Sequence, residues 1–137
     1  MSCVSAEIDV RLTAEDQPSV PLRLRLTYAS TDPYAVQAEF RHEGATLACW
    51  YFDREALAAG LRAPGGGGDV RFRPAATRRG PALRIELRGR IADDPGTAVF
   101  LADAVALARF LSGTHALVPP GTEVLDIDAL LDALLAN

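Results

Sequence analysis

Lysine is absent from this chain of 137 residues, and all 14 of its basic residues are arginine. Without lysine, neither Schiff-base catalysis nor a phosphate-binding loop that ends in a lysine is possible. Cysteine and histidine are scarce too. Cys3, Cys49, His42 and His115 lie far apart, whereas a zinc site needs such ligands clustered at short spacing. We therefore expect no metal site and no disulfide, with Cys49 as a small buried apolar residue.

Long apolar runs are missing as well. No stretch approaches the roughly 18 uninterrupted apolar residues of a membrane-spanning helix. Residues 1–7 lack the basic start and the apolar block of a secretory signal. We therefore expect a cytoplasmic protein without a membrane span. The four consecutive glycines at 65–68 are not followed by the Lys-Ser or Lys-Thr pair of a phosphate-binding loop, so they predict a mobile connector.

Catalytic motifs are absent too. No Gly-x-Ser-x-Gly elbow occurs, and the aspartates at 126, 128 and 132 lack the glycine and the terminal glutamate of a calcium loop. Most other carboxylates stand at positions typical of helix caps and turns. We predict that the protein is not an enzyme and uses no cofactor.

The net charge of −4 conceals an uneven distribution. Residues 62–90 contain eight arginines and two acids, residues 1–61 five arginines and nine acids, and residues 91–137 one arginine and seven acids. A basic middle segment between acidic flanks suits nucleic acid, an acidic protein or another copy of the same chain. A solvated strand surface explains the same pattern, so these interpretations stay open.

The length and the 49% apolar share fit a single folded domain over residues 1–137. The first half alternates apolar and polar residues, which predicts antiparallel strands near 4–12, 22–28, 36–40 and 46–52, interrupted by Pro18 and Pro21. In the last of these strands Trp50 and Phe52 share one face and Tyr51 takes the other. We expect Trp50 in the core and Tyr51 outside.

A helix follows each half of the chain. Asp53 is the predicted N-cap of the first helix, which ends at Gly60 or at the Ala63-Pro64 pair. The second half repeats the plan, with strands near 69–74, 82–90 and 97–102, a tight turn at 93–96, and a helix from the cap Asp103 to Gly113. A last helix begins after Asp126 or Asp128, and its own sheet or a neighbouring subunit must cover its apolar stripe of Ile127, Leu130, Leu131, Leu134 and Leu135.

Three short strings distinguish the chain, and two of them are turn chemistry next to an apolar run. They are Asp32-Pro33-Tyr34-Ala35-Val36, Gly68-Asp69-Val70-Arg71, and Val118-Pro119-Pro120-Gly121-Thr122-Glu123. None of them supplies a nucleophile, a metal cage or a phosphate loop. The sequence therefore favours a protein that holds a partner. The candidate interaction residues are Asp32, Pro33, Tyr34, Trp50, Asp69, Arg71, Pro119, Pro120, Gly121 and Glu123.

Together these residues resemble the SsgA-like family of actinobacterial sporulation and cell-division regulators. The resemblance covers nearly the whole chain. It runs through the three strings and through residues between them, which are Leu26, Tyr28, Ala38, Phe40, Trp50, Phe52, Arg54, Leu57, Gly60, Leu61, Pro74, Phe110, Leu111 and Thr114. Five such stretches in the same order at family-like spacing are a specific signal.

The resemblance implies a non-enzymatic cytoplasmic protein that acts at division septa. It implies contact with the tubulin-like protein FtsZ, with other SsgA-like proteins, or with both. It also implies a homo-oligomer, as a trimer, of a subunit similar to the Whirly-type fold that binds single-stranded nucleic acid. From the residues themselves we expect an α+β fold with two antiparallel meanders and about three helices, and the resemblance implies that the meanders form a barrel-like core. A single-stranded nucleic-acid-binding module is the alternative function, disfavoured because residues 62–90 offer only Phe72 for base stacking.

Overall fold

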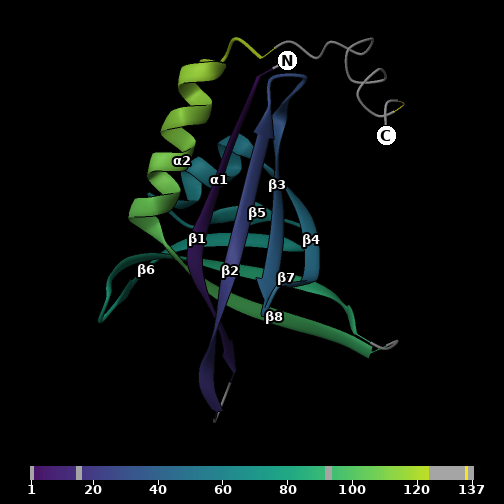
Figure 1. Cartoon of the computed structure of the whole chain (residues 1–137). Helices are drawn as coiled ribbons and strands as arrows, with labels where there is room; N and C mark the ends of the chain where they lie inside the picture. The colour runs from purple at the N-terminus through teal and green to yellow at the C-terminus, as the bar shows by residue number, and fades with distance from the viewer. Residues whose placement is uncertain (1, 15–16, 92–93, 124–134, 136–137) are drawn as a thin grey trace.

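The structure is a computed structural model that describes residues 2–14, 17–91, 94–123 and 135 (Figure 1). Eight antiparallel strands form one sheet in the order β4-β3-β2-β1-β8-β7-β6-β5. The first meander consists of β1 (Cys3–Ala14), β2 (Gln17–Ala29), β3 (Asp32–His42) and β4 (Ala45–Asp53). The second consists of β5 (Gly65–Gly67), β6 (Val70–Thr77), β7 (Gly80–Ile91) and β8 (Asp94–Asp103).

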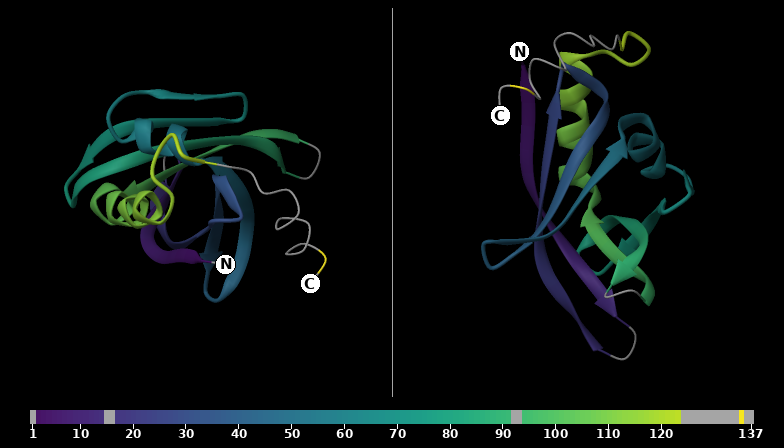
Figure 2. Two further views of the ribbon diagram at one scale, coloured as in Figure 1. Left: turned by 90° about the horizontal axis from the view of Figure 1, so that it is seen from above. Right: turned by 90° about the vertical axis from the view of Figure 1, so that its right-hand side faces the viewer.

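The two meanders join where β1 pairs with β8, from Val10 opposite Ala102 to Thr13 opposite Val99. Strong curling brings them face to face across the core, so that the strands of the first cross those of the second (Figures 1 and 2). Aromatic pairs link the facing sides: Phe40 stacks on Phe100 at 4.2 Å between ring centroids, and Phe52 meets Phe72 edge to face at 5.2 Å. The predicted barrel-like pair of meanders is confirmed, as a curled half-barrel.

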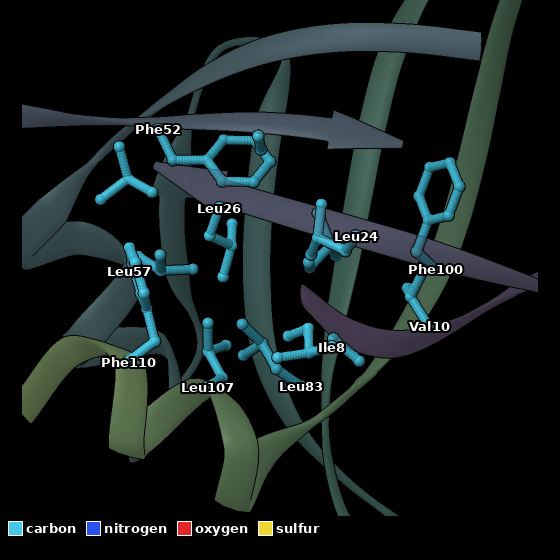
Figure 3. Packing of buried hydrophobic residues seen from close by; sticks show 14 of the residues in the cluster. Ile8, Val10, Leu24, Leu26, Phe52, Leu57, Leu83, Phe100, Leu107 and Phe110 are labelled. Carbon is cyan, nitrogen blue, oxygen red and sulfur yellow. The ribbon is translucent and has the colours of Figure 1, made fainter. Parts of the chain in front are cut away.

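Two helices lie in the described part of the chain, one after each meander, as the sequence predicts. The first, α1 (Arg54–Gly60), has Asp53 as its N-cap, which accepts a hydrogen bond from Ala56 N. The second, α2 (Ala104–Leu117), has Asp103 as its N-cap. Apolar side chains of both helices meet those of the sheet in one core (Figure 3), labelled there at Ile8, Val10, Leu24, Leu26, Phe52, Leu57, Leu83, Phe100, Leu107 and Phe110.

The structure corrects two expectations in the first meander. Cys49 is exposed, because it shares the outer face of the edge strand β4 with Tyr51, while Trp50 packs against the core as predicted. Pro18 and Pro21 do not interrupt β2, which begins at Gln17. A proline lacks the N–H that a central strand needs, and β3 pairs with β2 only from Arg23 onward, so both prolines stand where one side of β2 has no neighbour.

Glycine and turn predictions in the second half also need correction. Residues 65–67 form the short edge strand β5 on β6, where a mobile connector was expected. Gly113 does not end α2; the helix continues to Leu117, and a Cβ at Gly113 would approach Val4 Cγ1 to 3.2 Å, so this glycine marks close packing on β1. Residues 94–96, predicted in a turn, pair with β7.

The predicted third helix lies outside the described residues, apart from Leu135. Leu135 is in helical conformation and 82% exposed. Within the described residues, no helix is long and apolar enough to cross a membrane.

Candidate functional site

The third distinctive string contacts the guanidinium of Arg54, and two tyrosines link this site to the first string. Arg54 opens α1 directly after its cap, and its side chain is completely buried. A buried guanidinium has lost its water, so its N–H groups need partners in the protein. Arg54 takes them from the last turn of α2 and from the segment that follows it.

Each terminal nitrogen of Arg54 has a defined role. Nη1 donates to the carbonyl oxygens of Thr114 at 3.1 Å and Val118 at 2.7 Å. Nη2 donates to Glu123 Oε1 at 2.6 Å. The remaining Nε lies 3.2 Å from Glu55 Oε1 without hydrogen-bond geometry. Arg54 therefore ties together the end of α2 and the last part of the third string.

Two tyrosines connect this arginine to the first string. The guanidinium carbon lies 5.0 Å from the centroid of the buried Tyr28 ring, a cation–π contact. Tyr28 Oη donates to the carbonyl of the buried Pro33 at 2.9 Å. Tyr34 Oη donates to the backbone carbonyl of Glu123 at 3.0 Å while 47% of the residue stays exposed. We call four residues the hub residues: Arg54, Tyr28, Tyr34 and Glu123. They join β2, β3 and the start of α1 to the segment that follows α2.

The third string is shaped by its prolines and its glycine. Pro119 accepts hydrogen bonds from Thr122 N at 3.1 Å and from Thr122 Oγ1 at 2.6 Å. Gly121 has φ +80°, which is the left-handed conformation of the third residue in a type II turn with proline before it. This turn reverses the chain after α2 and returns Glu123 to Arg54.

The surroundings shift the pKa of two hub residues. The pKa of Glu123 is lowered because its own backbone N–H and the Arg54 guanidinium both donate to the carboxylate. Burial raises the pKa of Tyr28, against the smaller opposing effect of the Arg54 charge. At pH 7 Glu123 is therefore ionised and Tyr28 is neutral. Arg54 accordingly pairs with a carboxylate and lies over an uncharged aromatic ring.

The other predicted site residues lie elsewhere. Asp69 is exposed in the turn before β6, where its carbonyl accepts from Arg88 N at 2.9 Å. Arg71 is exposed on β6, opposite Glu86 of β7. Trp50 is half-buried on β4 and lies across from Gly89 of β7. Asp32 begins β3, and Pro120 is exposed in the proline turn.

The sequence indicated Arg54 only as part of the family pattern, and it indicated no role for His115. His115 Nε2 lies 2.9 Å from Glu55 Oε1, so the histidine extends the polar network around Arg54. No group of three metal-ligating side chains is found among the described residues. The signal that could have indicated Arg54 is its position between the apolar Phe52 and Leu57. An arginine at the start of a helix is normally exposed, so that signal is weak.

Comparison with known proteins places this arrangement in a family. The family model described as Streptomyces sporulation and cell division protein, SsgA, matches residues 22–123, which contain the whole hub. The chain belongs to the SsgA family. It is 39% identical to the sporulation-specific cell division protein SsgB of Salinispora tropica, over 98% of this chain and 94% of that protein. It is also 39% identical to the SsgB of Streptomyces coelicolor, over 98% and 96%.

Solved structures of SsgA-family proteins have the same fold. One, described in connection with SsgB mutations that correlate with longitudinal cell division during sporulation of Streptomyces coelicolor, superposes with a TM-score of 0.81 at 40% identity and covers 89% of this chain and 93% of that one. The SsgA-like sporulation-specific cell division protein of Thermobifida fusca superposes with a TM-score of 0.82 at 34% identity, over 98% and 94%. The family resemblance is thereby confirmed, and with it a role in sporulation and cell division.

Proposed function

We propose that this protein is a non-enzymatic regulator of sporulation-specific cell division that acts through protein–protein contacts at the septum, with FtsZ or another SsgA-family protein as its partner. The observation that supports this is the hub. The Arg54 side chain is completely buried, and its terminal nitrogens bond to two backbone carbonyls and to the Glu123 carboxylate. Such groups shape a surface and do not act on a substrate.

The surface that the hub shapes is the candidate contact patch, consisting of Tyr34, Pro119, Pro120 and Thr122. Tyr34 is half exposed but held through its hydroxyl group, and the proline turn next to it is held by its own hydrogen bonds. An aromatic side chain fixed in advance loses little conformational entropy on binding, which favours it as an interface anchor. The same surface is suited to a cytoplasmic partner or to the homotrimer that the family resemblance implies.

Co-sedimentation with polymerised FtsZ tests the proposal. We expect the wild-type chain to pellet with the polymer, and Tyr34→Ala to weaken this binding by roughly tenfold or more, as the loss of an aromatic anchor does. Tyr51→Ala is the matched control, because Tyr51 is 65% exposed on β4 and makes no contact with the hub.

Melting curves of both variants show whether they remain folded. A fluorescent fusion in the native host, expected in ladders at sporulation septa, tests the location. If the wild-type chain binds neither FtsZ nor any SsgA-family protein in sedimentation and two-hybrid assays, the proposed function is wrong.

A further inference from the structure

A cavity of about 630 Å³ lies at the opposite end of α2 from the hub, at the helix start. It is bounded by β1 and β2, by the tip of the β6–β7 hairpin and by the end of β8. Three arginines line it: Arg11 from β1, and Arg78 and Arg79 from the hairpin turn. A volume of this size accommodates a short segment of a binding partner.

The lining of this arginine cavity contains three arginines and two aspartates, a net charge of +1, and both aspartates have partners elsewhere. Asp9 forms an ion pair with Arg23, and Asp103 accepts the N–H groups of Val105 and Ala106 as the cap of α2. In the parts of the chain that the structure describes, none of the three arginines has a carboxylate within ion-pair distance. Arg11 donates to Ser19 Oγ at 2.8 Å, which holds it at the wall.

Apolar side chains stand between these cations. Pro81 and Leu101 line the cavity, and Val105 at the start of α2 is 47% exposed. Guanidinium groups around apolar walls complement a segment with carboxylates and apolar side chains in alternation. The ligand chemistry is therefore that of an acidic, amphipathic peptide.

This chain itself contains such a segment. Residues 124–137 include Asp126, Asp128 and Asp132 and no basic residue, and ten of their fourteen residues are apolar. Leu135, which the structure describes, is 82% exposed. We propose that the arginine cavity binds the acidic C-terminal segment, residues 124–137, of a second copy of this chain. The inference deepens the proposed function as an interaction module, on which it rests.

The occupant comes from another copy because Leu135, the described residue of this segment, is largely exposed and does not line the cavity of its own chain. The segment leaves the hub at Glu123, which is bonded to Tyr34 near the β2–β3 turn, whereas the cavity includes Ser19 near the other end of β2. Ten strand residues separate Ala29 from Ser19, about 33 Å. This separation and the exposed Leu135 favour the segment of another copy.

A charge-swap experiment tests the proposal with full-length chains in sedimentation velocity. We expect the wild-type chain to self-associate, and Arg78→Glu with Arg79→Glu to weaken association at least tenfold. Asp126→Arg with Asp128→Arg should weaken it as strongly. An equimolar mixture of the two variants should associate again, because each reversed cavity then meets a reversed segment. That recovery also shows that both variants are folded.

Arg62→Glu with Arg109→Glu is the matched control, since both arginines are exposed outside the cavity and the net charge changes equally. This control should associate like the wild type. The proposal is overturned if the wild-type chain stays monomeric, if the cavity variant associates as tightly as the control, or if the mixture fails to recover. These measurements use the purified chain alone, without FtsZ. A chain that fails them and still pellets with FtsZ would overturn only this inference.

Discussion

At the scale of single residues, Arg54 and Tyr34 hold the third string, at 118–123, against the first half of the chain. The Arg54 guanidinium holds the carbonyls of Thr114 and Val118 and the carboxylate of Glu123, and it lies over the ring of Tyr28. Only a planar group with several fixed donors satisfies this set of acceptors. The hub therefore depends on the shape of the arginine side chain as well as on its charge.

Replacing Arg54 should destabilise the fold severely. Arg54→Ala leaves the carbonyls of Thr114 and Val118 and the Glu123 carboxylate without their donor, so we expect a loss of about 3–5 kcal/mol in the free energy of unfolding. Arg54→Lys should recover only part of it, because an ammonium group cannot serve the three acceptors in the same plane. Urea denaturation measures both, with the exposed Arg62→Ala as the control. Equal stability of Arg54→Ala and Arg62→Ala would contradict the structural role.

The Glu123 carboxylate should make stability depend on acidic pH. Its pKa in the folded protein is below the ordinary 4.5, so its contribution is present above about pH 4.5 and is lost as the pH falls through the lowered value. Glu123→Gln lacks this contribution at every pH. We expect the stability difference between wild type and Glu123→Gln to be largest at neutral pH and to shrink on acidification below pH 4.5. A constant difference from pH 7 to pH 3 would show that the ion pair contributes nothing.

At the scale of elements, α1 packs on β6 through a glycine. A Cβ placed on Gly60 would lie 2.4 Å from Phe72 Cβ, far inside contact distance. The close approach brings Phe72 against Phe52, and this aromatic pair connects the two meanders. The sequence indicated Gly60 as one possible end of the helix, and α1 does end there. The packing role of Gly60 could not be predicted, because its neighbour Phe72 lies on β6, beyond the glycines at 65–68.

Gly60→Ala should therefore separate α1 from β6. We expect a loss of about 1–3 kcal/mol in thermal or urea unfolding, the usual effect of overpacking a core. Gly67→Ala is the matched control, because nothing lies within 4 Å of its added Cβ and its backbone is not left-handed. The control should change stability by less than about 0.5 kcal/mol. If the two variants melt alike, α1 does not pack on β6 as described.

The strand predictions succeeded where one face is buried and failed at the edges of the sheet. The alternation of apolar and polar residues correctly predicted β1 to β4 and β6 to β8. In a strand with one buried face, every second side chain points to the core. Residues 65–67 carry no side chains to alternate, so β5 had no signal. Cys49 was misassigned because its apolar neighbours in sequence belong to both faces of β4.

At the scale of the whole molecule, the fold separates charge from aromatic surface. Seven of the eight arginines of residues 62–90 lie on β6, β7 or the turn between them, where Phe72 is only 3% exposed. The exposed tyrosines Tyr34 and Tyr51 belong to β3 and β4 of the first meander. Sites for single-stranded nucleic acid combine a charged groove with stacking aromatics in one place.

This separation predicts that single-stranded nucleic acid does not bind specifically. We expect no gel retardation of a single-stranded oligonucleotide at physiological salt, and any retardation at low salt should decline steeply as salt rises. Retardation that persists at physiological salt and is weakened by Tyr34→Ala or Tyr51→Ala would instead support the alternative function.

The sequence by itself determined the strand periodicity, the caps Asp53 and Asp103, and the family pattern. The periodicity and the caps depend on neighbours within a few residues, where local hydrogen bonds and side-chain spacing decide conformation. Tertiary structure alone decided that Arg54 meets Glu123 and that Arg11 lines the same cavity as Arg78 and Arg79. These groups lie more than 60 residues apart, and the curl of the sheet brings them together because it buries the apolar faces of both meanders in one core.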